Sequence, residues 1–283
     1  MPQRPFFSII IPALNEEKYL PKLLDDLINQ TFQSFEVTIV DGHSDDQTFK
    51  KASEYVNKIP SLKVTSSTRR NVSIQRNMGA KLSRGEYLIF SDADNRLPKY
   101  FLEGLHYQLI YKPTDAFTCW VLPETNNQKD KTIATSLNLL LEASLLTKNP
   151  TGLGAMIGCK NSVFKKTTGF DPKIGFAEDT DFVRRVYKNG HSFRVIHDPR
   201  FIVSLRRYHA HGTIKVIQKS ATLLLKYLTK QPIDQKQEYP MGGKAFKKSS
   251  DDNLITKLDL FLNKPIKKQK ILEQLQSLIE FEE

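Results

Sequence analysis

Strand-like and helix-like segments alternate along the first hundred residues of this chain, and this alternation restricts the fold more than any other feature. Residues 7–11 (Phe-Ser-Ile-Ile-Ile) form an almost continuous apolar run, typical of a strand covered on both faces. The next apolar side chains, at positions 20, 23, 24, 27 and 28, keep helical spacing. Further strands are expected at 35–40, 62–65 and 87–90, with helices at about 46–56 and 71–82. Alternating strands and helices build parallel βα units, so the sequence predicts an α/β fold with a mostly parallel central sheet flanked by helices.

The pattern is less regular after Pro98. Helices are expected at 99–109, 132–146 and 179–188, and strands at 116–121, 193–196 and 201–205, whereas residues 151–158 are punctuated by glycine. From about residue 212 the sequence indicates basic helices joined by a polar loop at 231–252. A chain of 283 residues is long enough for one α/β domain and a smaller appendage. We therefore expect a domain at 1–212, with halves at 6–97 and 98–212, and a basic helical C-terminal extension at 213–283.

The chain is strongly basic, with a formal net charge of +11 and a pI near 9.4. This balance favours anionic partners such as nucleotide phosphates or an anionic lipid surface, and it also serves solubility. Zinc knuckles, RNP aromatics and basic zipper heptads are absent from the sequence, so no nucleic-acid partner is expected. Apolar residues at helical spacing in 213–228 favour either packing on the domain or peripheral membrane contact.

The sequence shows neither a secretion signal nor an apolar run of the roughly 20 residues that a membrane helix needs. We therefore expect a cytoplasmic protein, either free or peripheral on the inner face of the membrane. Cys119 and Cys159 lie in apolar contexts without metal-ligand spacing, which predicts buried free thiols.

Acidic side chains follow the predicted strands, at the edge where open α/β sheets bind ligands. Residues 12–17 (Pro-Ala-Leu-Asn-Glu-Glu) come after the first strand, where Asn15 is expected to cap a helix in which Pro21 fits poorly. Asp41 comes directly after the second strand and precedes Gly42. A carboxylate in that place can hydrogen-bond a base or a ribose, or it can begin a capping turn.

Asp92 and Asp94 follow the strand at 87–90 and carry the most information. Residues two apart in an extended chain project to the same side, with Cα atoms about 6–7 Å apart. Their carboxylates repel each other unless a cation or a hydrogen-bond donor compensates. Hard oxygen ligands suit Mg²⁺ or Mn²⁺, which would also neutralise a diphosphate. The pair therefore predicts a metal site at the edge of the sheet.

A last acidic cluster, at 178–181 (Glu-Asp-Thr-Asp), begins a helix and follows 169–171 (Gly-Phe-Asp). Acidic side chains at a helix N-terminus are stabilised by the helix dipole, which alone can explain the cluster. The alternative is that one of these carboxylates acts as a general base.

Taken in order, these motifs resemble the family 2 glycosyltransferases of the GT-A fold, over roughly residues 6–210. The matching segments are 11–17 (Ile-Pro-Ala-Leu-Asn-Glu-Glu), 40–48 (Val-Asp-Gly-His-Ser-Asp-Asp-Gln-Thr), 75–80 (Gln-Arg-Asn-Met-Gly-Ala), 85–94 (Gly-Glu-Tyr-Leu-Ile-Phe-Ser-Asp-Ala-Asp), and 169–171 with 178–181. Each is common alone, and the five together are specific. The resemblance implies a Rossmann-like GT-A domain in which 6–97 binds a nucleotide-sugar and 98–212 forms the acceptor and catalytic half.

What the resemblance implies is an inverting transferase that moves a sugar from a nucleotide-diphosphate donor to an acceptor hydroxyl. It makes Asp179 the general base, Asp94 the metal ligand on the diphosphate, and Asp92 a residue near both the ribose and the metal. The residues implied in donor binding are Pro12, Ala13, Asn15, Glu17, Asp41 and Arg76. The implied cofactor is Mn²⁺ or Mg²⁺. The sugar, the nucleotide, the acceptor (lipid-linked or polysaccharide) and the oligomeric state stay open.

The late part of the domain departs from the processive members of the family. A Gln-x-x-Arg-Trp signature is absent, which with the lack of membrane helices argues against a processive, membrane-embedded synthase. The corresponding region instead contains Arg206 and Arg207, which are candidates for clamping the diphosphate, and His209 and His211, which are candidates for reaching the metal. An ordinary polar strand end is the alternative.

Two other functions fit the same fold. A sugar-phosphate nucleotidyltransferase should have a Gly-rich loop with a basic residue after the first strand, where this chain has Asn-Glu-Glu at 15–17. A non-catalytic nucleotide- or carbohydrate-binding protein has no need to keep four acids together. The presence of Asp41, Asp92, Asp94 and Asp179 therefore favours an enzyme.

Overall fold

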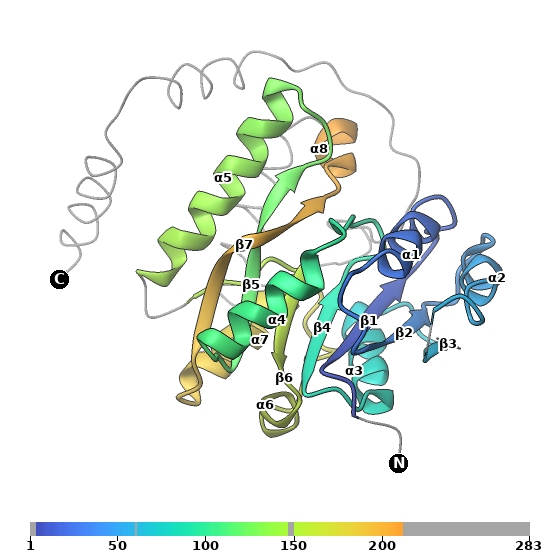
Figure 1. Ribbon diagram of the computed structural model, residues 1–283, viewed down its shortest axis with the longest axis horizontal. Helices are drawn as coiled ribbons and strands as arrows, with labels where there is room; N and C mark the ends of the chain where they lie inside the picture. Colours follow the sequence, from blue (N-terminus) through green and yellow to red (C-terminus); the bar gives the residue numbers. More distant parts are fainter. Residues whose placement is uncertain (1–3, 60, 147–149, 212–283) are drawn as a thin grey trace.

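A seven-stranded sheet forms the centre of the computed structural model, which describes residues 4–59, 61–146 and 150–211 (Figure 1). The strands are β1 (Phe7–Ala13), β2 (Phe35–Asp41), β3 (Leu62–Ser66), β4 (Tyr87–Ser91), β5 (Ala116–Pro123), β6 (Met156–Lys160) and β7 (Phe193–Val203). Their order in the sheet is β3-β2-β1-β4-β6-β5-β7. β1 pairs in parallel with β2 and β4, β2 with β3, and β5 with β7, whereas β6 runs antiparallel to β4 and β5. The predicted α/β fold with a mostly parallel sheet is confirmed.

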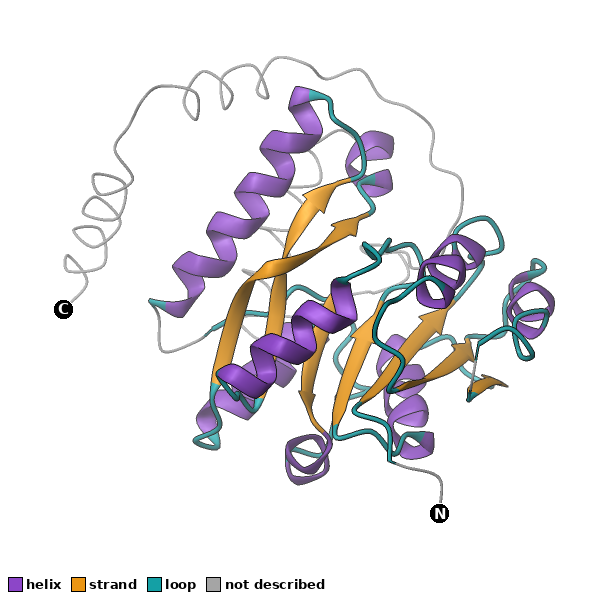
Figure 2. Ribbon diagram, viewed as in Figure 1, coloured by secondary structure: helices purple, strands orange, loops and turns teal. Residues whose placement is uncertain are grey.

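Helices cover both faces of this sheet (Figure 2). The apolar side chains of α1 (Leu20–Ile28), α2 (Thr48–Ser53), α4 (Phe101–Tyr111) and α5 (Gln128–Leu145) belong to one buried cluster. Those of α3 (Val72–Leu82), α6 (Asn161–Lys166) and α7 (Glu178–Lys188) belong to a second. The short helix α8 (Arg206–His211) follows β7.

The continuous apolar run of β1 is explained by this double cover. Ile9 and Ile11 pack in the first cluster, whereas Ile10 packs in the second. Side chains of a strand alternate between its two faces, so a strand buried on both faces needs apolar residues at every position. The same alternation places Ile89 of β4 in the first cluster and Phe90 in the second.

Three elements differ from the sequence-based expectation. The glycine-punctuated segment contains β6, and α6 follows it at once. The two strands expected at 193–196 and 201–205 are one strand, β7. Helix α1 begins at Leu20 with Tyr19 as its N-cap, so the prediction that Asn15 caps it is wrong, and Pro21 lies in the first turn, where proline is tolerated.

Cys119 on β5 and Cys159 on β6 are buried free thiols, as expected. Within the described part of the chain, no helix has the length and apolar character that crossing a bilayer requires. The expected extension at 213–283 lies outside the described residues.

Candidate active site

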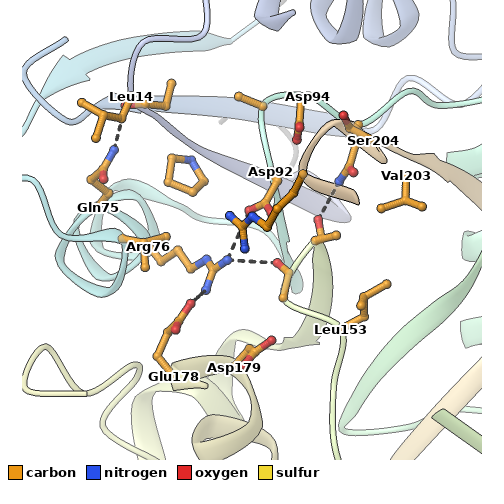
Figure 3. Close-up of a pocket in the computed structure, with 18 of the residues that line it drawn as sticks. Leu14, Gln75, Arg76, Asp92, Asp94, Leu153, Glu178, Asp179, Val203 and Ser204 are labelled. Atoms are coloured by element: carbon orange, nitrogen blue, oxygen red, sulfur yellow. Dashed lines mark hydrogen bonds and ion pairs between the residues drawn. The ribbon is translucent and has the colours of Figure 1, made fainter. Parts of the chain in front are cut away.

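A cavity of about 500 Å³ lies at the carboxyl ends of the parallel strands (Figure 3). It is lined by the loops after β1 and β4, the first turns of α3 and α7, the segment before β6, the end of β7 and the start of α8. Open α/β sheets bind ligands at this edge, and small-molecule pockets have volumes in this range. The cavity is therefore the candidate active site.

The structure brings three of the predicted acids, Asp92, Asp94 and Asp179, to the wall of this cavity. Figure 3 shows Asp92 beside Arg76, with Glu178 and Asp179 on one side of them and Asp94 on the other. Asp92 and Asp94 come from the loop after β4, and Asp179 comes from the first turn of α7. Carboxylates far apart in the sequence therefore meet around one cavity.

Asp41, the fourth predicted acid, ends β2 at the same edge of the sheet but is not among the described residues that line the cavity. Its side chain is 3% exposed and accepts hydrogen bonds from the backbone N–H of Ser44 (3.0 Å) and from Ser44 Oγ (2.6 Å). These contacts build a turn after β2. A contact of Asp41 with a nucleoside stays a prediction.

The loop after β1 is fixed by its polar side chains. Pro12 and Ala13 line the cavity, as the resemblance implies, whereas Asn15 and Glu17 are not among its described lining residues. Asn15 Oδ1 accepts from the backbone N–H of Asp45 (2.8 Å), and Glu17 Oε2 accepts from that of Gln47 (3.1 Å). In this arrangement both side chains tie the loop after β1 to the loop after β2.

Arg76 is a buried cation at the centre of the site, with 3% of its surface exposed. Its Nη1 donates to Glu178 Oε1 (2.9 Å), and its Nη2 donates to the carbonyl oxygen of Gly154 (2.9 Å) and to Asp92 Oδ1 (3.3 Å). The guanidinium carbon also lies 5.0 Å from the centre of the Phe170 ring. Arg76 therefore holds together the loop after β4, the segment before β6 and the start of α7.

The surroundings of Asp179 raise the pKa of its carboxyl group. Burial raises the pKa of its carboxyl group, the neighbouring Glu178 carboxylate raises it further, and Arg76 opposes both effects. Its Oδ1 accepts from the backbone N–H of Thr180 (2.7 Å). A carboxylate with a raised pKa accepts a proton more readily near neutral pH than an exposed aspartate does.

Arg206 joins the loops after β1 and β4. Its Nη2 donates to both oxygens of Glu16 (3.0 and 3.1 Å) and to Asp94 Oδ2 (2.5 Å), and its Nε donates to the same Asp94 oxygen (3.1 Å). Its guanidinium carbon lies 3.9 Å from the centre of the Tyr19 ring. Burial raises the pKa of Glu16 to about 7, because desolvation outweighs the favourable contact with Arg206.

Asp92 and Arg207 both line the cavity. Although 40% of the Asp92 side chain is exposed, its surroundings are mostly protein, and burial raises its pKa to about 6 against the opposing charge of Arg76. Burial lowers the pKa of Arg207, whereas the charges of Asp92 and Asp94 raise it. Both candidate arginines, Arg206 and Arg207, therefore lie beside the predicted metal pair.

His209 lies elsewhere than predicted. Its Nε2 is 3.1 Å from Oδ1 of Asp130, a carboxylate at the start of α5 with no exposed surface, and His209 is not among the described lining residues. The structure therefore does not bring His209 to Asp92 and Asp94 as a metal ligand, because its ring is already engaged by Asp130. The side chain of His211 lies outside the described residues.

The donor set fits a divalent cation that arrives with a phosphate group. Among residues 4–59, 61–146 and 150–211, no group of three or more His, Cys, Asp or Glu side chains is arranged to hold a metal. Mg²⁺ is commonly held by one or two carboxylates together with substrate phosphates, and Mn²⁺ suits similar oxygen ligands. Asp92 and Asp94 supply two such carboxylates on one wall.

Glu16, Glu178 and Gly154 are among the residues of the site to which the sequence assigned no role. The first two stand beside assigned acids, Glu17 and Asp179, so their chemistry was visible and only the direction of each side chain was not. Gly154 lies in the glycine-punctuated segment, whose backbone the site uses through its carbonyl oxygen.

Comparisons with known proteins identify the family of the chain. Residues 8–168 match the family described as glycosyl transferase family 2. The poly(ribitol-phosphate) beta-N-acetylglucosaminyltransferase TarS of Staphylococcus aureus is 28% identical over 217 residues, which cover 72% of this chain and 36% of TarS. An uncharacterized glycosyltransferase of Haemophilus influenzae is 27% identical over 192 residues, which cover 63% of this chain and 61% of that protein. The chain thus spans about a third of the first relative's length.

Solved structures show the same fold. S. aureus TarS 1-349 in complex with UDP-GlcNAc superposes with a TM-score of 0.58 and 22% identity, over 82% of this chain and 69% of that one. The mannosyltransferase PcManGT from Pyrobaculum calidifontis, in complex with GDP-Man and Mn²⁺, gives a TM-score of 0.64 and 19% identity, over 82% and 66% of the two chains. The predicted GT-A type of fold is confirmed.

Proposed function

This chain belongs to glycosyl transferase family 2, and on that basis we propose that it is an inverting glycosyltransferase. It moves a sugar from a nucleotide-diphosphate donor to an acceptor hydroxyl. The observation that carries this proposal is the convergence of Asp179, Asp92 and Asp94 on one cavity that also holds Arg206 and Arg207. The proposed base and the side chains suited to binding a diphosphate therefore line the same cavity, where one bound substrate can contact both.

Asp179 is the base of the proposed reaction. In its ionised form it accepts the proton of the acceptor hydroxyl while that oxygen bonds to the anomeric carbon of the sugar. The bond from this carbon to the diphosphate oxygen breaks, and its electron pair leaves with the nucleotide diphosphate. A single displacement inverts the anomeric centre and needs one carboxylate, whereas a retaining reaction needs a nucleophile as well.

The leaving diphosphate gains charge as this bond breaks, and the cavity offers positive groups for it. Arg206 and Arg207 are the candidate partners, because a guanidinium forms paired hydrogen bonds with phosphate oxygens. Asp92 and Asp94 are the residues that would hold a divalent cation, Mn²⁺ or Mg²⁺, whose charge assists departure of the diphosphate when it is bound. Arg76 contributes by fixing Asp92 and the start of α7.

The donor is proposed to lie with its nucleoside against Pro12 and Ala13, near the turn built by Asp41. Asn15 and Glu17 support that end of the cavity by holding the two loops together. Complexes of relatives with UDP-GlcNAc and with GDP-Man and Mn²⁺ support a nucleotide-sugar donor and a divalent cation. They name two different nucleotides and two different sugars, so donor identity is a matter for assay.

A lipid-linked or polysaccharide acceptor is the proposal that fits the names of relatives. TarS acts on poly(ribitol-phosphate), and a relative from Borreliella burgdorferi, 31% identical over 99 residues, is a cholesterol galactosyltransferase. We propose a cytoplasmic protein in peripheral contact with the membrane, and the net charge of +11 supports contact with an anionic lipid surface. Co-sedimentation with anionic vesicles tests this contact, and equal binding with and without residues 213–283 would exclude the extension as its cause.

Turnover of a panel of UDP- and GDP-sugars by the full chain with Mn²⁺ tests the reaction. Asp179→Asn should lower kcat by about 10²–10⁴-fold while nucleotide affinity changes by less than about twofold, because the base acts in the transition state. Asp94→Asn and EDTA should each abolish turnover. Arg194→Gln, which removes a charge at the far end of β7, is the control and should keep the wild-type rate.

The rival functions predict different results. A chain that binds nucleotide but turns over no donor would be a binding protein on this fold. A chain that forms a nucleotide-sugar from sugar phosphate and nucleoside triphosphate would be a nucleotidyltransferase. Unchanged activity of Asp179→Asn would remove Asp179 as the base.

A further inference from the structure

Arg206 occupies the carboxylate that the proposed function assigns to a metal. Both its Nε and its Nη2 donate to Oδ2 of Asp94, at 3.1 and 2.5 Å. We propose that Arg206 is the resident counter-ion of the donor site: it neutralises Asp94 in the donor-free protein and leaves this carboxylate when a divalent cation binds with the donor diphosphate. The inference rests on the proposed function, since the cation and the diphosphate belong to the donor.

The first step of the argument is competition for one oxygen. A guanidinium that makes two hydrogen bonds to Asp94 Oδ2 takes up the lone pairs of that oxygen, which leaves a cation only Oδ1 of this carboxylate. A divalent ion placed on the same carboxylate would also lie within a few ångströms of the arginine charge, and like charges at that distance repel strongly. Arg206 therefore lowers the affinity of Asp94 for a cation for as long as it stays there.

The second step is that Arg206 has another partner to hold it nearby. Glu16 accepts from Nη2 through both carboxylate oxygens, at 3.0 and 3.1 Å, and the Tyr19 ring lies 3.9 Å from the guanidinium carbon. Glu16 is 9% exposed, so leaving it without a partner is costly. When Asp94 is taken, Arg206 remains paired with Glu16 at the wall of the same cavity.

The third step is charge balance. Arg206 offsets one of the two carboxylates it contacts, so a cation alone would add positive charge while separating the arginine from Asp94. A diphosphate that arrives with the cation supplies new anionic oxygens, to which a guanidinium binds well. The exchange is then favourable only when both arrive. Arg206 thereby makes cation binding depend on the nucleotide, and by linkage nucleotide binding on the cation.

The alternative is that Arg206 has a purely structural role: its ion pairs hold α8 against the loops after β1 and β4, and it stays paired with Asp94 throughout. In that case no exchange occurs, and the cation binds through other oxygens of the cavity. The two readings differ in what happens to cation affinity when the arginine is replaced.

Binding of Mn²⁺ alone to the full chain separates them, measured by the electron paramagnetic resonance signal of free Mn²⁺ with no nucleotide present. Arg206→Gln should bind Mn²⁺ about tenfold more tightly than wild type or better, because one charge-assisted competitor is lost. Arg206→Gln combined with Asp94→Asn should lose this gain. Arg194→Gln, with the same charge change at the opposite end of β7, should bind Mn²⁺ as wild type does.

Adding UDP or GDP gives the second measurement. Wild type should bind Mn²⁺ at least about tenfold more tightly with the fitting nucleotide than without it, and Arg206→Gln should show a smaller difference. If Arg206→Gln does not fold, Arg206→Lys replaces it. A lysine ammonium cannot hydrogen-bond two carboxylates at once as the planar guanidinium does, so Mn²⁺ affinity without nucleotide should still rise. Mn²⁺ affinity equal to wild type in each folded Arg206 variant would overturn the proposal.

Failure of the proposed reaction gives a different pattern. If the Arg206 variants gain Mn²⁺ affinity but no donor is turned over, the reaction is refuted and the competition at Asp94 remains. If donors are turned over with Mn²⁺ and the Arg206 variants show no gain in Mn²⁺ affinity, Arg206 has a purely structural role and only the exchange is refuted.

Discussion

Oδ2 of Asp179 lies directly against the backbone of Gly154. A Cβ atom added at Gly154 would come within 2.5 Å of this oxygen, which is closer than such atoms approach. The same Gly154 offers its carbonyl oxygen to Arg76 at 2.9 Å. The absence of a side chain at Gly154 therefore provides the space that the carboxylate of Asp179, the proposed base, occupies.

Gly154→Ala should displace Asp179 without unfolding the protein. The colliding atom is the end of a side chain that can rotate away, so we expect the free energy of unfolding to change by less than about 1 kcal/mol. A displacement of about 1 Å at a reacting group costs on the order of 10²-fold in rate, so kcat should fall by about that factor. Donor turnover and thermal unfolding measure the two effects.

Gly104→Ala is the matched control for this substitution. Gly104 lies in α4 and is not among the described residues that line the cavity, so its loss should leave kcat unchanged. A Gly154→Ala protein with wild-type kcat would show that Asp179 does not need its present position and would count against its role as the base.

Glu178→Gln should move the acid limb of the pH–rate profile to lower pH. The pKa of Asp179 is raised by burial and by the Glu178 carboxylate. Removing that negative charge lowers the pKa of Asp179, and it also frees the positive charge of Arg76 to act in the same direction. A general base must be ionised, so kcat/KM falls as the pH drops through its pKa. The variant should therefore keep activity to lower pH than wild type.

The measurement is kcat/KM against pH, because this ratio reports the free enzyme. Glu103→Gln is the control: it removes one negative charge from α4, where Glu103 accepts a hydrogen bond from Thr31, and it should leave the profile unchanged. A shift of the acid limb to higher pH in Glu178→Gln would mean that Glu178 acts chiefly by holding Arg76 in place.

Much of the fold and part of the site followed from local sequence pattern. The strands at 7–13 and 87–91 were predictable because they are largely apolar on both faces, and the strand at 35–41 because apolar and polar residues alternate over 35–39. Their acids were expected at one edge because parallel strands end together. Asp92 and Asp94 lie at that edge for this reason. The position of Asp179 near these two acids could be anticipated only through the resemblance to a family, because the sequence of its own helix does not show which part of the sheet the helix start faces.

Strand β6 could not be predicted in the same way. Its five residues include Gly158, where an added Cβ would lie 2.0 Å from Phe117 Cζ, so the glycine is required by a ring on the neighbouring strand β5. The segment is a strand because it pairs with β4 and β5, and such pairing is not encoded within five residues.

The direction of adjacent acids was equally hidden. Glu16 and Glu17 are chemically alike, yet Glu16 faces Arg206, 190 residues later, whereas Glu17 accepts from the loop after β2. The sequence-based prediction started the helix after Asn15, whereas the helix begins after Tyr19. The two glutamates therefore lie in a turn before the helix, and their different directions could not be predicted.

His209→Ala should reduce stability and leave metal binding unchanged. The His209 ring lies 3.1 Å from Oδ1 of Asp130, and Asp130 is fully buried, so removing the ring strips a partner from a carboxylate that water does not reach. We expect the free energy of unfolding to fall by about 1–3 kcal/mol.

His191→Ala is the matched control: its partner Asp115 is partly exposed and keeps Lys160 at 3.1 Å, so the loss should be smaller. Denaturant unfolding gives both values, and Mn²⁺ affinity in the presence of UDP or GDP should stay within about twofold of wild type in both variants. A tenfold weaker Mn²⁺ affinity in His209→Ala alone would restore His209 as a metal ligand and would mean that α8 moves when the donor binds.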